Sequence, residues 1–329
     1  MKMSGGDKKM SVDFRKVAVV GCGFVGSSGA FALMQSGMFS EMVLIDVNKD
    51  RAEGEAMDIS HGTSLNAPMN IYAGDYADAR DAAITVITAG AAQKPGETRL
   101  DLIHKNISIY SGIMEQIRKQ KFEGILLIVS NPVDILTYYA KKMSGMPEER
   151  VFGSGTVLDT ARLRTLLGTK LNVDSRSVHV SVIGEHGDSE IATWSSANIS
   201  GVPLQDFFAL RGMGDRDLHQ VEEEIADDVK NAAYRIIEKK HATYYGIAMS
   251  IVRICRAVLK DEKSVLPVST SLKGSYGING CALSVPAIVG RNGIEGLVPV
   301  SLSEDERDRL AASAEVLKKN MADIDFTVR

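Results

Sequence analysis

Three side chains in two short segments have types and spacings that could form a catalytic site. His186 lies in GEHGDS, a glycine-flanked segment that follows the strand-like run VSVI. Asp159 and Arg162 are three residues apart in TVLDTARLR and share one face if this segment is helical. A carboxylate can orient and charge an imidazole, and a guanidinium can hold a substrate carboxylate, which is the chemistry that reduction of a 2-keto acid needs. An isolated histidine is more often structural, and the spacing does not by itself bring the three groups together.

A glycine motif near the N-terminus indicates a dinucleotide site. Gly21, Gly23 and Gly26 form GxGxxG between a strand-like run and a helical segment. Glycines there allow a tight turn, a close approach to a pyrophosphate and close helix packing. Asp46 stands 20 residues later, where a carboxylate would accept hydrogen bonds from ribose hydroxyls and repel a phosphate, which favours NAD over NADP. The alternative is a glycine-rich turn with no ligand.

Such a site needs a parallel sheet to position it, and the first half of the chain has that pattern. Short apolar runs alternate with segments of helical period, as in a doubly wound α/β (Rossmann) sheet whose strands are buried on both faces. Ligands of such sheets bind beyond the carboxyl ends of the strands. Six parallel strands are predicted, over 17–20, 42–46, 69–73, 84–88, 125–129 and 151–153.

The second half predicts a mixed α+β substrate domain over residues 153–329, after a dinucleotide-binding domain over residues 1–152. The first 14 residues have no period and are expected to form a mobile tail. The predicted elements of the second half are a helix over 157–168, a strand pair near 177–183 and 191–198, a helical region over 217–260, antiparallel strands over 264–300, and a final helix opened by Ser303 and Glu306 with a buried stripe of Leu310, Ala314, Leu317 and Met321.

The composition excludes several classes of partner. The 329 residues carry 38 Lys and Arg against 42 Asp and Glu, a net charge of −4, which provides no basic surface for nucleic acid or anionic lipid. Hydrophobic residues make up 44% and charged residues 24%, values typical of a folded globular protein. We therefore expect a small-molecule substrate and no nucleic acid or membrane partner.

The three cysteines indicate neither a metal site nor a disulfide framework. Cys22, Cys255 and Cys281 are an odd number set far apart, which suggests a reducing, cytoplasmic setting and no bound metal. Cys22, inside the glycine motif, is interpreted as a small buried residue. The 24 uncharged residues from Val17 to Ser40 resemble a membrane-spanning segment, but five glycines interrupt them and another strand-like run follows.

Seven ordered motifs carry a resemblance to a known family. They are VVGCGFVGSS, LIDVN, TAGAAQKPGETRLDL, VSNPVD, SGTVLDTARLR, GEHGDSE and ATYYGIA. From about Lys16 to the C-terminal helix, the chain resembles the bacterial NAD-dependent L-lactate dehydrogenases of the lactate/malate dehydrogenase family. The resemblance implies reversible hydride transfer between L-lactate and NAD, which gives pyruvate and NADH.

The resemblance also implies roles for the charged side chains. His186 would be the general acid and base, with Asp159 as the partner that holds its tautomer and favours its charged form. Arg162 would bind the substrate carboxylate through two parallel hydrogen bonds. Arg99 would polarise the substrate carbonyl when a loop closes. The alternative for Arg99 is a surface arginine that opens a helix.

Further positions are implied to line the cofactor and substrate sites. Asn131 resembles an asparagine that hydrogen-bonds the substrate oxygen, and its bond to Pro132 is expected to be cis. Thr243 corresponds to a threonine that lines the substrate pocket. The implied cofactor contacts are Gly21, Gly23, Phe24, Val25, Gly26, Asp46, Gly90 and Asn131.

Gln93 is the position expected to select the substrate. Malate dehydrogenases carry an arginine there, which pairs with the second carboxylate of oxaloacetate, whereas glutamine leaves that charge uncompensated. The sequence departs from the common family motif at two positions, with Ala92 where Asn is frequent and His241 where Gly is frequent. The shape of the substrate pocket is therefore not determined by the resemblance. The alternatives are a malate or branched 2-hydroxy acid dehydrogenase and a non-catalytic NADH-binding sensor, against which the intact catalytic set argues.

The resemblance finally implies regulation between subunits. Many bacterial members of the family are tetramers activated by fructose 1,6-bisphosphate, whose phosphates contact an arginine and a histidine. Arg164 and His179 match these positions. On a helix Arg164 would point about 200° away from Arg162 and the catalytic face. One arginine and one histidine are common on any surface, so their spacing alone is a weak signal for a homotetramer with this effector.

Overall fold

The fold is built around one large twisted sheet, whose parallel half comes from the first half of the chain. The computed structural model describes residues 12–91 and 98–327. In this half the strands lie in the order β3-β2-β1-β4-β5-β6, the doubly wound order in which the chain reverses direction between β1 and β4. Their bounds are β1 Asp13–Val20, β2 Glu41–Ile45, β3 Asn70–Ala73, β4 Ala82–Ile87, β5 Ile125–Ile128 and β6 Val151–Gly153.

All six predicted strands are confirmed, with shifts of a few residues at their ends. One correction concerns the N-terminus: β1 begins at Asp13, so residues 13 and 14 belong to a strand and not to the predicted tail. Residues 1–11 lie outside the described parts of the chain. The strand extends this far because Asp13 N–H donates to Asp81 O at 2.8 Å, beside β4.

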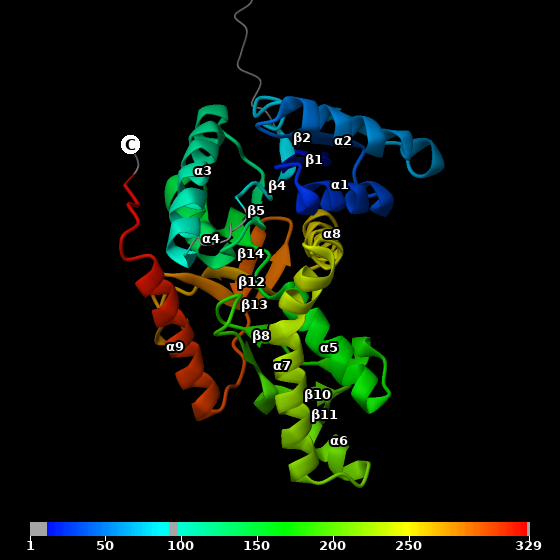
Figure 1. Ribbon diagram of the computed structural model, residues 1–329, viewed down its shortest axis with the longest axis vertical. Helices are drawn as coiled ribbons and strands as arrows, with labels where there is room; N and C mark the ends of the chain where they lie inside the picture. Colours follow the sequence, from blue (N-terminus) through cyan, green and yellow to red (C-terminus); the bar gives the residue numbers. More distant parts are fainter. Residues whose placement is uncertain (1–11, 92–97, 328–329) are drawn as a thin grey trace, which may run out of the picture.

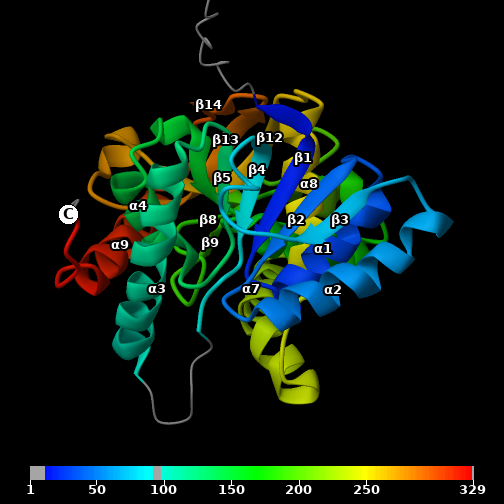
Figure 2. The same ribbon diagram turned by 90° about the horizontal axis from the view of Figure 1, so that it is seen from above.

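Helices cover both faces of the parallel strands, as Figure 2 shows. Within β1, Ala18 and Val20 pack with the side of α3 and α4, whereas Val17 and Val19 pack with the side of α1, α2 and α8. This burial on both faces is why the strands read as uninterrupted apolar runs. The covering helices are α1 Phe24–Ser36, α2 Lys49–His61, α3 Arg99–Gln120 and α4 Val133–Met143.

The C-terminal strands extend the same sheet. The antiparallel strands predicted over 264–300 are present, and β12 pairs with β6 through Ser269 and Gly153. In the described chain the sheet therefore has nine strands, in the order β14-β13-β12-β6-β5-β4-β1-β2-β3. The added strands are β12 Ser264–Ser271, β13 Ala282–Gly290 and β14 Gly293–Leu297. The domain boundary after residue 152 stays a prediction, and the sheet continues across it.

A smaller mixed α/β layer follows β6 and forms its own apolar core. The predicted strand pair is present as two short ladders, β8 with β9 and β7 with β10. Its elements are α5 Val157–Leu171, β7 Val178–His179, β8 Val182–Ile183, β9 Ile191–Ala192, β10 Asn198–Ile199, β11 Val202–Pro203, α6 Leu204–Leu210 and α7 Asp215–Lys240. Short 3-10 turns lie at Thr63–Leu65, Glu148–Arg150, Ser175–Ser177, Trp194–Ser196 and Ser275–Gly277.

The helical region predicted over 217–260 is two helices. α7 ends at Lys240, and its C-cap residue His241, with a φ of 67°, lies in the left-handed region. α8 then runs over Tyr245–Leu259. In Figure 1, α8 lies between α1 and α5. A Cβ at Gly29 of α1 would lie 3.1 Å from Ile251 of α8, so these two helices pack closely.

The final helix, α9, has the predicted start and the predicted buried face. It spans Glu304–Asn320, and the capping box between Ser303 and Glu306 is present. All four residues of its predicted stripe are buried, namely Leu310, Ala314, Leu317 and Met321. Across the described residues, no helix combines the length and apolarity needed to cross a bilayer. The uncharged run from Val17 to Ser40 is instead the end of a strand, a turn and α1.

Candidate active site

The glycine motif forms the turn that joins β1 to α1. Gly21 has a φ of 97°, and a Cβ there would lie 2.5 Å from the backbone nitrogen of Ala89. A Cβ at Gly26 would lie 1.8 Å from the carbonyl oxygen of Gly21. Gly23 differs, because no atom of the described residues, apart from its own neighbours in the chain, lies within 4 Å of the position of its Cβ. The first and third glycines are therefore required by the turn, and the second leaves open space in front of α1.

Asp46 lies beside this turn, at the end of β2. Its carboxylate accepts the backbone N–H of Cys22 at 2.6 Å and that of Asn48 at 2.8 Å. Cys22 itself is buried, and burial, reinforced by Asp46, raises the pKa of its thiol to about 12. This agrees with the interpretation of Cys22 as a small packing residue, and the contacts fix Asp46 against the turn.

The other predicted cofactor contacts gather at the same edge of the sheet. Phe24 and Val25 open α1, whose first turn lacks a side-chain cap. Gly90 follows β4 and Asn131 follows β5, and both are exposed. The carboxyl ends of parallel strands share one edge, so these residues and Asp46 border one site. The donor set, free N–H groups at a helix start plus a carboxylate one strand away, fits a dinucleotide without a 2′-phosphate.

A second cluster is built where α4 follows β5. The Asn131–Pro132 peptide bond is cis, as the resemblance implied. Two residues later, Asp134 is buried and accepts hydrogen bonds from the Ser269 hydroxyl at 2.5 Å and from the backbone N–H of His186 at 2.7 Å. Burial raises the pKa of Asp134 to about 6 although both hydrogen bonds oppose this. Asp134 therefore ties α4, β12 and the segment that carries His186.

The His186 segment is held from three directions. Gly184, with a φ of 93°, exchanges two backbone hydrogen bonds of 2.9 Å with Ser284 of β13. The backbone N–H of Glu185 donates to the Ser313 hydroxyl of α9 at 2.9 Å. With the contact from Asp134, these bonds fix the backbone on both sides of the imidazole, so its position does not depend on its own side-chain contacts alone.

Asp159 approaches from α5. The Thr156 hydroxyl donates to the carbonyl of Val182 at 2.5 Å, and the Val182 N–H donates to the Thr160 hydroxyl at 2.8 Å. These bonds attach the first turn of α5 to β8, two residues before the His186 segment begins. Asp159 lies on that turn and is buried.

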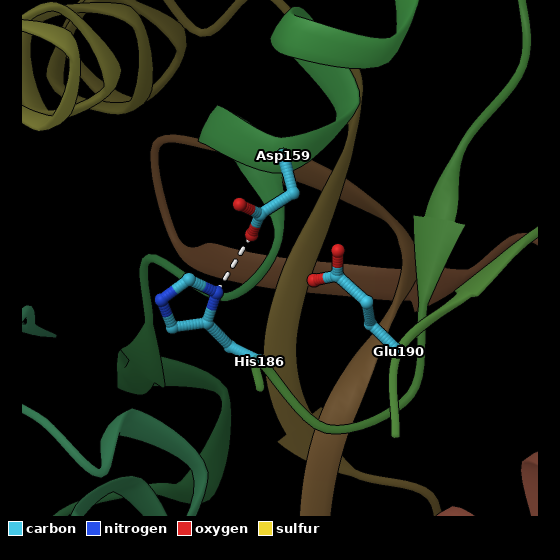
Figure 3. Close-up of side chains that lie close together, drawn as sticks. All are labelled: Asp159, His186 and Glu190. Atoms are coloured by element: carbon cyan, nitrogen blue, oxygen red, sulfur yellow. Dashed lines mark hydrogen bonds and ion pairs between the residues drawn. The ribbon is translucent and has the colours of Figure 1, made fainter. Parts of the chain in front are cut away.

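The imidazole and the carboxylate meet, as the sequence analysis proposed. His186 Nδ1 lies 2.6 Å from Asp159 Oδ2, and Figure 3 shows the other ring nitrogen pointing away from the carboxylate. Burial lowers the pKa of His186, but Asp159, with smaller contributions from Asp134 and Glu190, overcomes this and raises it to about 9. The ring is therefore charged at neutral pH, and its free nitrogen can donate a proton.

Arg162 joins this pair on the predicted face of α5. Its guanidinium donates to Asp159 Oδ1 at 2.6 Å, and its side chain is 16% exposed. Burial opposes ionisation of Asp159, yet His186 and Arg162 together lower the pKa of its carboxyl group. One carboxylate thus holds both cations, and the other N–H groups of the guanidinium can bind a ligand.

Glu190, which the sequence analysis passed over, lies beside the pair. Ligand atoms of Asp159, His186 and Glu190 all lie within 4.8 Å of one another, and Figure 3 shows the Glu190 carboxylate on the side of the ring that faces Asp159. Burial, followed by the charge of Asp159, raises the pKa of Glu190 to about 8. Both oxygens of Asp159 already accept from His186 and Arg162, so we assign no metal to this group.

Two of the missed residues left a signal in the sequence. Asp134 is the charge that follows a buried strand and the pair Asn131–Pro132, and Glu190 ends the same motif as His186. A lone carboxylate in an apolar segment is seldom buried without a partner. The sequence did not show which groups these two carboxylates face, since Ser269, which donates to Asp134, and Asp159, which lies near Glu190, are distant along the chain.

The remaining substrate positions are placed only in part. Thr243 lies in the break between α7 and α8 and is half-buried. The start of α8 packs on α5, because a Cβ at Gly246 would lie 2.8 Å from Leu158 Cδ1, one residue before Asp159. Arg99 is the first residue of α3, and its side chain is not described. Gln93 and Ala92 lie outside the described residues, so their predicted roles stay predictions.

The two predicted effector residues lie close together, away from the imidazole. Arg164 donates through Nε to the carbonyl of Val180 at 3.0 Å, directly next to His179 in the chain. His179 is exposed on β7, and burial lowers the pKa of Arg164. A half-buried arginine and an exposed histidine therefore border one surface between α5 and β7.

Comparison with known proteins identifies the class. Residues 15–153 match the model of the lactate/malate dehydrogenase NAD binding domain, and residues 156–326 match the alpha/beta C-terminal domain of the same family. The chain belongs to the lactate/malate dehydrogenase family, and it is an NAD-dependent dehydrogenase.

Individual relatives within this family are L-lactate dehydrogenases. The chain is 50% identical over 309 residues to L-lactate dehydrogenase 1 of Clostridium acetobutylicum, covering 94% of this chain and 98% of the relative. It is 51% identical over 306 residues to the L-lactate dehydrogenase of Priestia megaterium, covering 93% and 95%.

Solved structures show the same similarity. A lactate dehydrogenase named MGS-M5, from a Medee basin deep-sea metagenome library, has a TM-score of 0.90 at 45% identity and covers 94% of this chain and 98% of its own. The ligand-bound minor L-lactate dehydrogenase of Enterococcus mundtii has a TM-score of 0.91 at 43% identity, covering 97% and 100%.

Proposed function

We propose that this NAD-dependent L-lactate dehydrogenase interconverts L-lactate and pyruvate with His186 as its general acid and base. The observation that carries the proposal is the contact of one carboxylate, Asp159, with both the imidazole and the Arg162 guanidinium, each at 2.6 Å. A proton donor and a carboxylate-binding group then lie side by side, as reduction of a 2-keto acid requires.

The cofactor would lie across the carboxyl ends of β1, β2, β4 and β5. The turn at Gly21, Gly23 and Gly26 would accept the pyrophosphate, and Asp46 would accept the ribose hydroxyls. Phe24, Val25, Gly90 and Asn131 would complete the contacts. When bound, NADH supplies the hydride for pyruvate reduction and NAD accepts it in the reverse direction. Residues 1–152 would form this cofactor domain and residues 153–329 the substrate domain.

His186 would give the proton that the keto oxygen needs during pyruvate reduction. Asp159 accepts from Nδ1, so the other ring nitrogen carries the proton that is transferred, and the same nitrogen accepts a proton from L-lactate in the reverse direction. The half-buried position of the ring limits competition from water.

The other polar residues would orient the substrate. Arg162 would bind its carboxylate with the guanidinium donors that Asp159 leaves free. Asn131 would hydrogen-bond the substrate oxygen, and Thr243 would line the pocket. Arg99 would polarise the carbonyl when its loop closes over the site.

Neutral Gln93 would favour pyruvate over oxaloacetate. The second carboxylate of oxaloacetate would lack a cationic partner there, and an unpaired charge in a closed site is costly. The three cysteines are free and buried, which supports a reducing, cytoplasmic location.

Activation by fructose 1,6-bisphosphate in a homotetramer is the regulatory part of the proposal. Arg164 and His179 would bind its phosphates between subunits. Exposed apolar side chains on α1, α7 and α8 support association with further copies of the chain, namely Phe24, Phe31, Ile237, Tyr245 and Met249.

The decisive experiment measures NADH oxidation with pyruvate, oxaloacetate and a branched 2-keto acid, for the native enzyme and for Gln93→Arg. Strong preference of the native enzyme for pyruvate is expected. Gln93→Arg should move the ratio of kcat/KM values toward oxaloacetate by at least about tenfold, the effect of one new ion pair of about 1.4 kcal/mol. An unchanged ratio would contradict the specificity argument. NADH binding without turnover of any keto acid would favour a sensor.

A further inference from the structure

Glu190 is a titratable side chain whose carboxylate lies within 4.8 Å of ligand atoms of Asp159 and His186, and the proposed chemistry does not use it. We propose that Glu190 is a positioning residue that sets the proton affinity of His186 by its own ionisation and thereby the pH range of each reaction direction. This inference rests on the proposed role of His186 as the general acid and base.

The geometry places Glu190 behind the ring and not in front of it. Glu190 lies four residues after His186, directly before β9. Its carboxylate lies within 4.8 Å of ligand atoms of both Asp159 and His186. In Figure 3 it is on the Asp159 side, whereas the free ring nitrogen points the opposite way. Glu190 can therefore act on the pair through its charge without contacting the substrate.

Two carboxylates this close do not ionise equally. Asp159 has a cation within 2.6 Å of each oxygen, so it keeps its negative charge. Among the described residues no hydrogen bond to the Glu190 carboxylate is found, so the repulsion between the two carboxylates raises the pKa of Glu190 and not that of Asp159. Burial and this repulsion together raise the pKa of Glu190 to about 8, which brings its ionisation into the range where His186 itself titrates.

The groups that face Glu190 come from several elements. Asp159 opposes its ionisation, whereas His186 and Arg162 favour it, and Lys230 of α7 adds a positive charge. Asp134 of α4 also favours the charged form of the imidazole. Of the two carboxylates, Asp159 contacts two cations and Glu190 contacts none among the described residues. Glu190 is therefore the carboxylate whose charge changes between neutral and mildly alkaline pH.

Protons can reach Glu190 without passing the substrate. Its side chain borders a cavity of about 1040 Å³ that is lined by α7, α9 and the segment around Trp194. Asp188, Asp227 and Lys230 line the same cavity. Glu190 can therefore follow the pH of the solvent while a substrate occupies the space in front of His186.

The consequence of ionisation follows from the sign of the charge. A carboxylate beside an imidazolium stabilises the charged ring, so His186 holds its proton more tightly once Glu190 is ionised. The two sites titrate as a coupled pair. The native enzyme should then keep reducing pyruvate to a higher pH than an enzyme with a neutral side chain at this position.

The test compares Glu190→Gln with the native enzyme from pH 6 to pH 10, in both directions. Glutamine has the same shape and cannot ionise. The pH at which kcat/KM for pyruvate falls by half should decrease by about 0.5 to 1 unit, a loss of about three- to tenfold at the alkaline end. Lactate oxidation, which needs a neutral ring, should reach half its maximum at a correspondingly lower pH.

Glu223→Gln is the matched control. Glu223 lines the same cavity but is exposed on α7 and outside the group around His186. The same chemical change there should leave both pH profiles at the native values. Glu190→Asp, which retains a carboxylate, should give a profile between the native and the glutamine variant. Equal NADH affinity and equal Tm for all variants exclude a general structural effect.

Two outcomes overturn the inference. An unchanged profile in Glu190→Gln means that its charge does not act on His186, and an equal shift in Glu223→Gln means that the effect is not local. His186→Gln separates this from failure of the proposed function. If His186→Gln is inactive while Glu190→Gln keeps the native profile, only the role of Glu190 fails. If His186→Gln keeps turnover, the proposed acid and base is wrong.

Discussion

At the scale of single residues, one buried carboxylate organises the site. Asp159 is buried, and its two oxygens contact His186 and Arg162, so few other residue types could replace it. Its contacts keep His186 charged and hold Arg162 toward the same space. Asp134 fixes the backbone of His186 by accepting its N–H. The chemistry therefore depends on two carboxylates with different tasks, one acting on the ring and one on its backbone.

The first prediction concerns Asp159→Asn. The change removes the main group that raises the pKa of His186 and leaves only the smaller contributions of Asp134 and Glu190 to oppose burial, which lowers it. The native ring is charged below about pH 9, so native pyruvate reduction should fall only as the pH rises past that value. In the variant the fall should occur below neutral pH, with about a hundredfold loss of kcat/KM at pH 7.5.

The pH profile of kcat/KM for both directions checks this prediction. NADH affinity serves as the control, because Asp159 lies away from the turn that would hold the cofactor. An alkaline limb that stays near pH 9 in Asp159→Asn would show that another group sets the charge of the ring.

At the scale of elements, the turn between β1 and α1 requires glycine for two different reasons, steric exclusion of a side chain and space for a ligand. Gly26 faces the backbone of Gly21 so closely that no side chain fits, whereas Gly23 faces open space. The motif therefore contains a structural glycine and a glycine that keeps room for a ligand. Sequence spacing alone does not distinguish these two requirements, since both residues satisfy the same motif.

The second prediction uses this difference. Gly26→Ala should lower the free energy of unfolding by about 3 kcal/mol, because the added Cβ overlaps a carbonyl oxygen. Gly23→Ala should change it by less than about 1 kcal/mol, yet weaken NADH binding by at least about tenfold, equivalent to about 1.4 kcal/mol. Urea unfolding and a fluorescence titration with NADH measure the two quantities.

Gly54→Ala is the control for both glycine variants. Gly54 is exposed within α2, and outside the backbone of that helix no described atom lies within 4 Å of its Cβ position. Alanine there should bind NADH normally and be neutral or slightly stabilising. Native NADH affinity in Gly23→Ala would mean that the open space in front of α1 is not the cofactor site.

The helical region over 217–260 shows the limit of local patterns at this scale. The sequence has a helical period on both sides of His241, so a long helical region was predicted without the break. The structure breaks it where α8 turns to pack on α1 and α5, with Gly246 against Leu158. That contact joins residues almost 90 positions apart, and helical periodicity contains no information about it.

At the scale of the whole molecule, the two halves of the chain share one sheet. β12 pairs with β6 through Ser269, and the same residue donates to Asp134 behind His186. Asp134, near the start of α4, is thus held by a strand from the C-terminal half while it accepts the backbone N–H of His186. Assembly of the group around His186 therefore requires both halves of the chain.

The third prediction concerns regulation. Arg164→Gln should abolish activation by fructose 1,6-bisphosphate, because a neutral amide cannot pair with a phosphate. The maximal rate without effector should stay at the native value, since Arg164 contacts Val180 and not the imidazole. Rates and molecular mass, each measured with and without the bisphosphate, check this. Native activation in the variant would remove Arg164 from the effector site.

The sequence by itself determined which segments form the six parallel strands and the glycine turn with Asp46. It also determined that Asp159 and Arg162 share one helix face and that the final helix is capped. These features depend on residues within about 20 positions of each other, where periodicity and turn chemistry act. The tertiary structure alone decided that β12 joins β6, that Asp134 supports His186 and that Glu190 faces Asp159. Each of these is a contact between distant segments, formed only when burial of both faces of the sheet brings those segments together.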